Sequence, residues 1–194
     1  MKKALGTLIL TSLILFLTSP AFSDDITFGL GASARDDDAT LYFPIKMKRF
    51  IIEPMISYAK MDREYSSASQ EIEAEMTAYN VGVGVLMYNE VMKNTDLIYG
   101  VRFGYIKEET DEEWSATGSV DRSASIDTQG YFVAPTVGFE YNFTEHISAG
   151  LYFSLEYSAL DGEQNEYDGV DFSESDVEYS GFSTETDIFL KFYF

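Results

Sequence analysis

Apolar and polar side chains alternate along most of this 194-residue chain. A repeat of two residues is the signature of β-strands, because successive side chains of a strand point to opposite faces of the sheet. In the last segment the even-numbered residues become steadily more apolar from Phe182 to Phe194, whereas Glu185, Asp187 and Lys191 fall on the other face. The pattern predicts an all-β fold.

Eight segments carry this alternation, and we expect one strand in each: 26–34, 39–47, 50–61, 75–88, 95–106, 129–142, 146–159 and 179–194. The connections between them are alternately short and long, with long loops expected at 62–74, 107–128 and 160–178. This arrangement is typical of an antiparallel up-and-down sheet. Three predicted strands contain a proline, which removes a hydrogen bond from the ladder. We therefore expect a bulge or a skipped pair at Pro44, Pro54 and Pro135.

The apolar faces have two possible environments. A soluble sandwich buries them, whereas a membrane barrel turns them to lipid and fills its lumen with the mixed faces. An aromatic residue ends the apolar face of six strands, as expected where lipid meets water: Tyr58, Tyr79, Tyr105, Tyr131, Tyr157 and Phe182. The other end of each apolar face lies about 9–11 residues away, which suits a tilted strand that crosses a bilayer. The glycines fall on the mixed face, where a narrow lumen needs small side chains. We predict an eight-stranded antiparallel up-and-down transmembrane β-barrel, with a soluble exported β-protein as the alternative.

The N-terminus has the layout of a secretory signal peptide. Lys2 and Lys3 precede an apolar run over 5–17, and small residues surround Ala21-Phe22-Ser23. The alternative, an uncleaved membrane anchor, needs about 20 apolar residues, and this run is shorter. We expect residues 1–23 to be removed and 24–194 to form one barrel domain. The chain has no cysteine, which excludes disulfides and a lipid-anchored cysteine.

The signal peptide, the eight alternating strands and the aromatic C-terminus together resemble the small outer-membrane β-barrel superfamily. That superfamily includes the OmpA transmembrane domain, the OmpX/Ail group and the opacity proteins. The stretches "FVAPTVGFEYNF" and "FIIEPMISY" resemble the sequence pattern that recurs in that superfamily where a strand leads into a turn. The resemblance implies a monomer in the outer membrane of a Gram-negative bacterium, in contact with lipid and lipopolysaccharide, with both termini periplasmic. It also implies that the barrel-assembly machinery recognises a signal formed by Ile188, Leu190, Phe192 and Phe194.

The formal net charge is −20, and most of it falls within 35–38, 62–75, 107–128 and 160–179. Such a surface repels nucleic acid. Three explanations fit this concentration of negative charge in the predicted loops. They are a solvated exterior, weak divalent-cation binding through carboxylates, and a basic surface partner. Acidic loops beside anionic lipopolysaccharide also repel it unless cations bridge the two. The candidate cation ligands are Glu108, Glu109, Asp111, Glu112, Glu113, Asp161, Glu163, Glu166, Asp168 and Asp171.

The predicted lumen face carries charges that are costly to bury unpaired. We expect them to form a paired network of Lys46, Glu53, Arg102, Glu140, Glu156, Glu185, Asp187 and Lys191. Eight strands leave an interior just wide enough for side chains. The network therefore favours a plugged lumen over the alternative, a narrow pore for small solutes.

An enzymatic role depends on the single histidine. His146 and Ser148 resemble the His-x-Ser pair of lipid A deacylases with this architecture, and Glu156 is the available downstream acid. However, Ala149 replaces the asparagine that usually follows the serine, and eight residues of extended strand separate Ser148 from Glu156 by about 25 Å. We therefore predict no enzyme activity and no cofactor, and a structural or surface-interaction role. A lipid A-modifying enzyme is the less favoured alternative.

Overall fold

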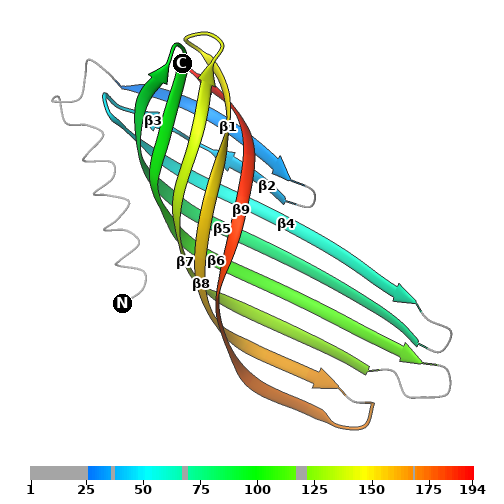
Figure 1. Ribbon diagram of the computed structural model, residues 1–194. Coiled ribbons are helices and arrows are strands. Elements are labelled where there is room, and N and C mark those ends of the chain that lie inside the picture. Colours follow the sequence, from blue (N-terminus) through cyan, green and yellow to red (C-terminus); the bar gives the residue numbers. More distant parts are fainter. Residues whose placement is uncertain (1–25, 36–37, 67–69, 117–121, 168) are drawn as a thin grey trace.

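The computed structural model describes residues 26–35, 38–66, 70–116, 122–167 and 169–194, so the predicted signal peptide lies outside the described residues. Within these ranges no helix is long and apolar enough to cross a membrane. The strands are β1 (Thr27–Arg35), β2 (Asp38–Tyr42), β3 (Ile45–Lys46), β4 (Phe50–Ser66), β5 (Gln70–Met92), β6 (Thr95–Ala116), β7 (Arg122–Asn142), β8 (Ile147–Tyr167) and β9 (Phe172–Tyr193). Each pairs antiparallel with its neighbours, and β1 also pairs with β9, which closes a ring (Figure 1).

The ring has eight strand positions, because β2 and β3 are two parts of one strand between β1 and β4. The all-β up-and-down barrel is therefore confirmed. The break between β2 and β3 spans Phe43 and Pro44, which face Pro54 and Glu53 on β4. Neither proline has an N–H, so the ladder loses bonds here, although the Phe43 N–H still donates to the Pro54 carbonyl at 2.9 Å. The register is the same on both sides of the break.

A similar interruption lies between β7 and β8. Val133 pairs with Tyr157 and Thr136 with Ser154, but Ala134 and Pro135 have no partner on β8. The register is again unchanged across the gap. All three strand prolines thus produce skipped pairs rather than bulges.

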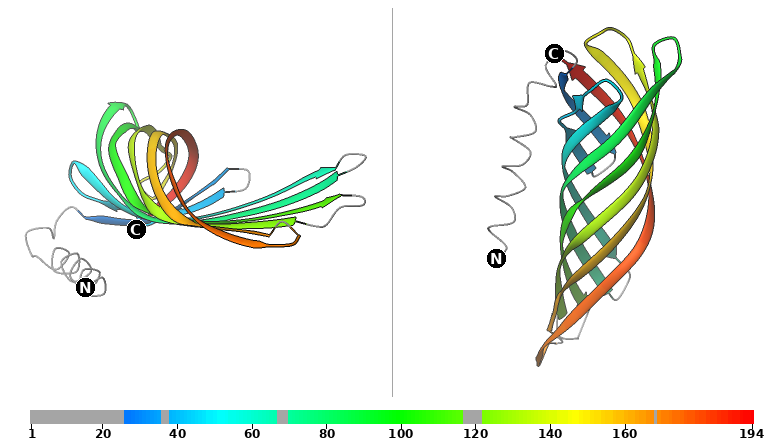
Figure 2. Two further views of the ribbon diagram at one scale, coloured as in Figure 1. Left: turned by 90° about the horizontal axis from the view of Figure 1, so that it is seen from below. Right: turned by 90° about the vertical axis from the view of Figure 1, so that its left-hand side faces the viewer.

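The strands are staggered around the ring. Following directly paired residues from Phe189 on β9 leads back to β9 at Tyr179, ten residues along the strand, by way of Ser33, Thr40, Ser57, Asn80, Ile106, Gly130 and Leu160. A stagger of this kind accompanies strands tilted by about 35–45° from the barrel axis. The tilt is visible in the right-hand view of Figure 2.

Apolar side chains cover the outside of the ring. Between Tyr131 and Tyr141 every odd-numbered residue is exposed and every even-numbered one is buried. At the end of the ring far from the C-terminus, three outward aromatic pairs face each other across neighbouring strands: Tyr58 with Tyr79, Tyr105 with Tyr131, and Tyr157 with Phe182, at ring-centroid distances of 5.2, 5.9 and 5.1 Å. We call these six residues the girdle. Exposed apolar side chains bounded by aromatic residues form the surface expected of a barrel in lipid.

Six strands continue well beyond the girdle, so the loops predicted at 62–74, 107–128 and 160–178 are wrong. Pairing runs without a shift to Ser66 and Glu71, to Trp114 and Arg122, and to Tyr167 and Phe172. We call this projecting sheet the extension. It comprises β4 from Lys60, β5 up to Ala78, β6 from Ile106, β7 up to Gly130, β8 from Ser158 and β9 up to Gly181. Figure 1 shows these strands projecting past β1 and β2.

The extension is an open sheet, because the β1–β2 hairpin is much shorter than the other three. β2 pairs with β4 only as far as Ala59, and β1 pairs with β9 only as far as Phe189. Beyond these residues β4 and β9 form the two edges of the sheet (Figure 2). The barrel is therefore closed up to the girdle and open beyond it.

Candidate functional site

The centre of the lumen holds an ion cluster contributed by three strands. Glu53 on β4 accepts hydrogen bonds from Arg102 on β6, at 2.7 Å, and from Lys191 on β9. Lys191 also donates to the Tyr152 hydroxyl at 2.6 Å. The alternation of each strand turns these side chains inward, and all are almost completely buried. One carboxylate thus holds two cations, and its two oxygens are both used.

Aromatic rings and one further acid surround this cluster. The Arg102 guanidinium lies 4.0 Å from the centre of the Tyr152 ring, and Tyr152 stacks on Phe189 at 4.4 Å. Asp187 lies 3.7 Å from Arg102 and adds a second negative charge. The side chains of Tyr152, Phe189 and Lys191 are almost completely inaccessible to water. The middle of the lumen is therefore packed, as expected when an eight-stranded barrel is filled with side chains.

A second polar group lies nearer the end of the barrel that holds the C-terminus. One oxygen of Glu140 accepts hydrogen bonds from Ser148, at 2.5 Å, and from the Tyr193 hydroxyl, at 2.9 Å. Its other oxygen is buried and has no hydrogen-bond partner among the described residues. The group links β7, β8 and β9 around the closing strand.

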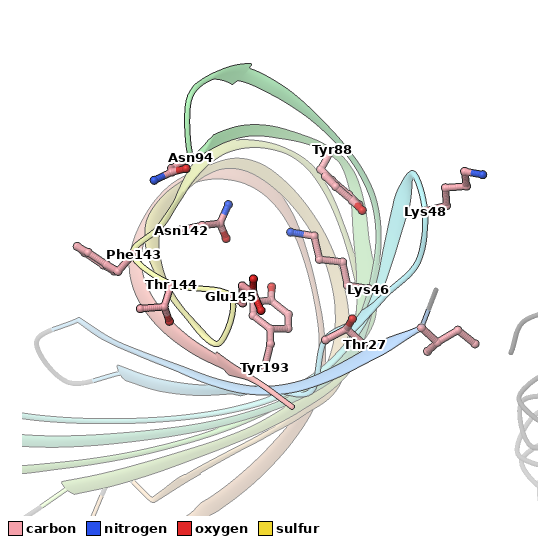
Figure 3. A pocket seen from close by; sticks show the side chains of 11 residues that line it. Thr27, Lys46, Lys48, Tyr88, Asn94, Asn142, Phe143, Thr144, Glu145 and Tyr193 are labelled. Atoms are coloured by element: carbon pink, nitrogen blue, oxygen red, sulfur yellow. The ribbon is translucent and has the colours of Figure 1, made fainter. Parts of the chain in front are cut away.

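The end of the barrel next to the C-terminus contains an open cavity of about 960 Å³. Lys46 pairs with Asp96 at 3.2 Å and lies 4.4 Å from the centre of the Tyr88 ring, and Asn142 donates to Asp96 at 3.1 Å. Figure 3 shows Lys46, Asn142 and Tyr193 inside the ring, whereas Lys48 points away from it. The charge of Lys46 is thus already neutralised by Asp96.

The structure brings four of the eight predicted lumen charges into one cluster: Glu53, Arg102, Asp187 and Lys191. Glu140 and Lys46 belong to separate groups, and Glu156 and Glu185 lie half-buried further toward the extension. Asp96, Ser148 and Tyr152 were not predicted as partners. Their even-numbered positions on inward faces were a usable signal for lumen location, but not for pairing.

His146 and Ser148 belong to different contacts. Nδ1 of His146 lies 3.0 Å from the Tyr193 carbonyl oxygen, while the Ser148 hydroxyl donates to Glu140. Ser148 is fully buried, whereas His146 is exposed in the turn that precedes β8. No hydrogen bond joins the two side chains in the described structure, so the arrangement lacks the serine–histidine contact that activates a hydroxyl nucleophile.

Eight of the ten candidate cation ligands lie on β6 or β8, and Asp171 directly precedes β9. Along β6 the side chains of Glu109, Asp111 and Glu113 share the outward face, whereas Glu108 and Glu112 share the inward one, because strand side chains alternate. Asp168 lies outside the described residues. Within the described ranges, no three acidic, histidine or cysteine side chains are placed to hold a metal ion.

The outward face of the extension is acidic across several strands. Glu64 pairs with Glu73 and Glu73 with Glu113, while Asp62 pairs with Glu75 and Glu75 with Asp111. These six residues line a hollow of about 630 Å³. Like charges directly opposite each other on a sheet are destabilising. Lys60 offsets part of this cost through ion pairs with Glu75, at 2.9 Å, and Asp62, at 3.6 Å.

The inward face of the extension has the opposite character. Its side chains include Met61, Ile72, Met76, Trp114 and Ile126, all partly buried. Within the ring the outside is apolar and the lumen carries the ions, so the polarity of the two faces inverts at the girdle. This inversion is what an outward face requires when it leaves lipid for water.

Glu108 and Glu112 are charged exceptions on the inward face of β6, and Glu108 makes the extension sensitive to pH. Burial raises the pKa of the Glu108 carboxyl above its ordinary value of 4.5. A raised pKa favours folding while the carboxyl is protonated, and this contribution is lost as the pH rises through the folded-state pKa. Glu108→Gln is therefore expected to stabilise the extension at pH 7 by less than about 1 kcal/mol and to have no effect below pH 4.5. Urea titration monitored by the emission of Trp114, the single tryptophan, measures this, and an equal gain at both pH values contradicts it.

Comparison with solved structures finds other outer-membrane proteins. A major outer membrane protein from Thermus thermophilus is similar over 87% of this chain and 99% of its own, with a TM-score of 0.57 and 11% identity. Ail, the attachment invasion locus protein of Yersinia pestis, matches 87% of this chain and 94% of its own, with a TM-score of 0.38 and 14% identity.

The ferric yersiniabactin uptake receptor FyuA from Yersinia pestis matches 78% of this chain, with a TM-score of 0.43 and 8% identity, and this chain spans only 24% of that receptor. No protein-family model matches the sequence, and neither does a curated protein. The Thermus protein shows that the fold is that of an outer-membrane β-barrel.

Proposed function

We propose that this chain is exported, loses residues 1–23 and enters the outer membrane of a Gram-negative bacterium as a monomer, with both termini periplasmic. The apolar outside of the ring, bounded by the girdle, supports insertion into lipid. The C-terminus lies at the end opposite the extension (Figure 1). A periplasmic C-terminus therefore puts the extension outside the cell.

The proposed assembly signal has a consistent geometry. The side chains of the last strand that project outward from the barrel are Ile188, Leu190, Phe192 and Phe194, all of them exposed. The intervening Phe189, Lys191 and Tyr193 are buried in the lumen. The outward row is the one that a folding factor in the membrane is able to contact.

The working surface in this proposal is the extension, which docks an extracellular partner along its free β9 edge. The packed ion cluster around Glu53 is the observation that favours surface interaction over conduction, because Glu53, Arg102 and Lys191 are almost completely inaccessible to water. An unpaired strand edge presents backbone N–H and C=O groups to another strand, which is a common mode of protein recognition. If planar-bilayer recordings of the barrel show stable single-channel steps, the narrow-pore alternative is correct instead.

Labelling of single cysteines on cells tests the orientation, since the chain has no cysteine of its own. Ser123→Cys, exposed on the extension, is expected to react with a membrane-impermeant maleimide on intact cells. Thr144→Cys, in the exposed turn between β7 and β8, is expected to react only after the outer membrane is permeabilised. The reverse order of reactivity places the extension in the periplasm and refutes the proposal.

A further inference from the structure

The free edge of β9 has a definite chemistry, because only alternate residues direct their backbone groups toward it. The Tyr193 N–H donates to the carbonyl of His146, the residue before β8, whereas the Phe194 N–H donates to the Phe28 carbonyl, on the side of β1. The β8–β9 register has no shift between Ile147 and Tyr167. Even-numbered β9 residues therefore face the edge throughout, and beyond Phe189 no strand covers them.

The same even-numbered residues carry carboxylates. Glu174, Asp176 and Glu178 are exposed, and their side chains lie on the outward, acidic face of the extension. The residues between them on the inward face are small or apolar, as with Ser175 and Val177. A strand added to this edge places one of its side chains directly opposite each carboxylate, on the same face and with Cα atoms about 5.5 Å apart.

We propose that the β9 edge binds an extended segment of another protein that has lysine or arginine at every second position and small or apolar residues between. This inference rests on the proposed role of the extension as a docking surface and adds the chemistry of its partner. Opposite charges facing each other across two strands are favourable. Because side chains alternate every two residues on both strands, each carboxylate lies opposite a cation while both backbones stay extended.

Charge argues against a second copy of this chain as the occupant. Two β9 edges bring Glu174, Asp176 and Glu178 against the same residues. The other free edge, on β4, offers Asp62 and Glu64 on the outward face with only Lys60 to offset them. Like charges directly opposite each other are destabilising, so the occupant is a basic segment from elsewhere.

The probe is a capped eight-residue peptide that alternates lysine and valine, titrated into the mature barrel in detergent micelles at 0.15 M salt and followed by fluorescence anisotropy. Neutralising the edge with Glu174→Gln, Asp176→Asn and Glu178→Gln is expected to weaken binding roughly tenfold. The matched control neutralises Glu73, Glu75 and Asp111 in the same way. These residues lie at least three strands from the edge, about 14 Å at 4.8 Å per strand, which exceeds the screening length of about 8 Å. The control is expected to bind within a factor of about two of the wild type.

A second pair of variants tests the edge itself. Ser180→Pro removes an N–H that faces the free edge and leaves the bonds to β8 in place, which edge strands tolerate. It is expected to weaken binding about fivefold, both for the lysine–valine peptide and for a neutral serine–valine peptide, whereas Ser180→Ala leaves binding unchanged. The heat-dependent gel mobility of each variant reports whether the barrel has folded.

The outcomes separate the two proposals. If the neutralised edge binds the lysine–valine peptide as tightly as the wild type while Ser180→Pro weakens it, the partner chemistry is wrong and docking at the edge stands. If Ser180→Pro has no effect on either peptide, docking at the strand edge is wrong, and the inference built on it falls as well. Equal binding of a peptide with four consecutive lysines followed by four valines also overturns the inference, since only the number of charges then matters.

Discussion

Glu53→Ala is expected to lower the free energy of unfolding by about 3–5 kcal/mol, the cost of leaving buried charges without their partner. The carboxylate bonds both Arg102 and Lys191 in a layer with almost no exposure. After its removal the remaining acid beside Arg102 is Asp187, at 3.7 Å. Urea titration of the barrel in detergent, followed by far-ultraviolet circular dichroism, measures the loss.

The double variant Glu53→Met with Lys191→Met is the control for this prediction. It removes one charge of each sign, leaves Arg102 beside Asp187 and preserves much of the packing volume. Replacement of a buried ion pair by apolar residues of similar size is often neutral or stabilising, so we expect it to recover most of the loss. A cost below about 1 kcal/mol for Glu53→Ala alone, the range of solvated pairs, means that water reaches the cluster and that the lumen is not packed.

Gly150→Ala is expected to destabilise the barrel by about 1–3 kcal/mol, as overpacking of a close-packed interior does. A Cβ atom at this position lies 2.0 Å from the Phe139 carbonyl oxygen and 2.6 Å from the edge of the Phe189 ring. The carbonyl belongs to the backbone of the neighbouring strand, so relief requires a shift of β7 relative to β8. The same urea titration measures this effect.

Gly181→Ala is the matched control. It lies on the inward face of β9, where a Cβ atom meets nothing within 4 Å. Without a clash, alanine restricts the unfolded chain more than glycine does, and the expected change is between none and a gain of about 1 kcal/mol. Equal losses at Gly150 and Gly181 attribute the effect to a general property of glycine in strands and not to the width of the lumen.

The assignment of side chains to the two faces of the barrel was predictable from the sequence. A shift of one residue exchanges every side chain between lipid and lumen, so alternation defines the faces wherever they differ in polarity. The girdle residues were identified in this way, and the structure pairs them directly across neighbouring strands. The glycines crowded by neighbouring strands, such as Gly150, were placed on the lumen face for the same reason.

The composition of the segments between the predicted strands favours loops and so conceals the extension. The segments between the predicted strands are rich in Asp and Glu, which are depleted in strands. Yet Ile72, Trp114 and Ile126 keep the two-residue period within these segments, on the opposite face from the apolar residues of the ring. A strand whose outward face meets water tolerates carboxylates there, so composition alone was a poor guide to where the strands end.

The pairs in the lumen could not have been predicted. Glu53 and Lys191 are 138 residues apart, and they meet because the ten-residue stagger brings β9 and β4 to matching heights across the barrel. Alternation shows which residues face inward, but it carries no information about height. Tyr152 and Ser148 were overlooked as partners for the same reason.

The unbroken register of the projecting hairpins has a consequence for how such proteins diversify. Removal of two residues from each strand of a hairpin shortens it by one full repeat of the pleat and leaves every remaining side chain on its original face. Removal of a single residue from one strand instead exchanges the faces of everything beyond it. The distance that the extension reaches beyond the ring is therefore a quantity that evolution is able to adjust in steps of two residues, while the ring stays as it is.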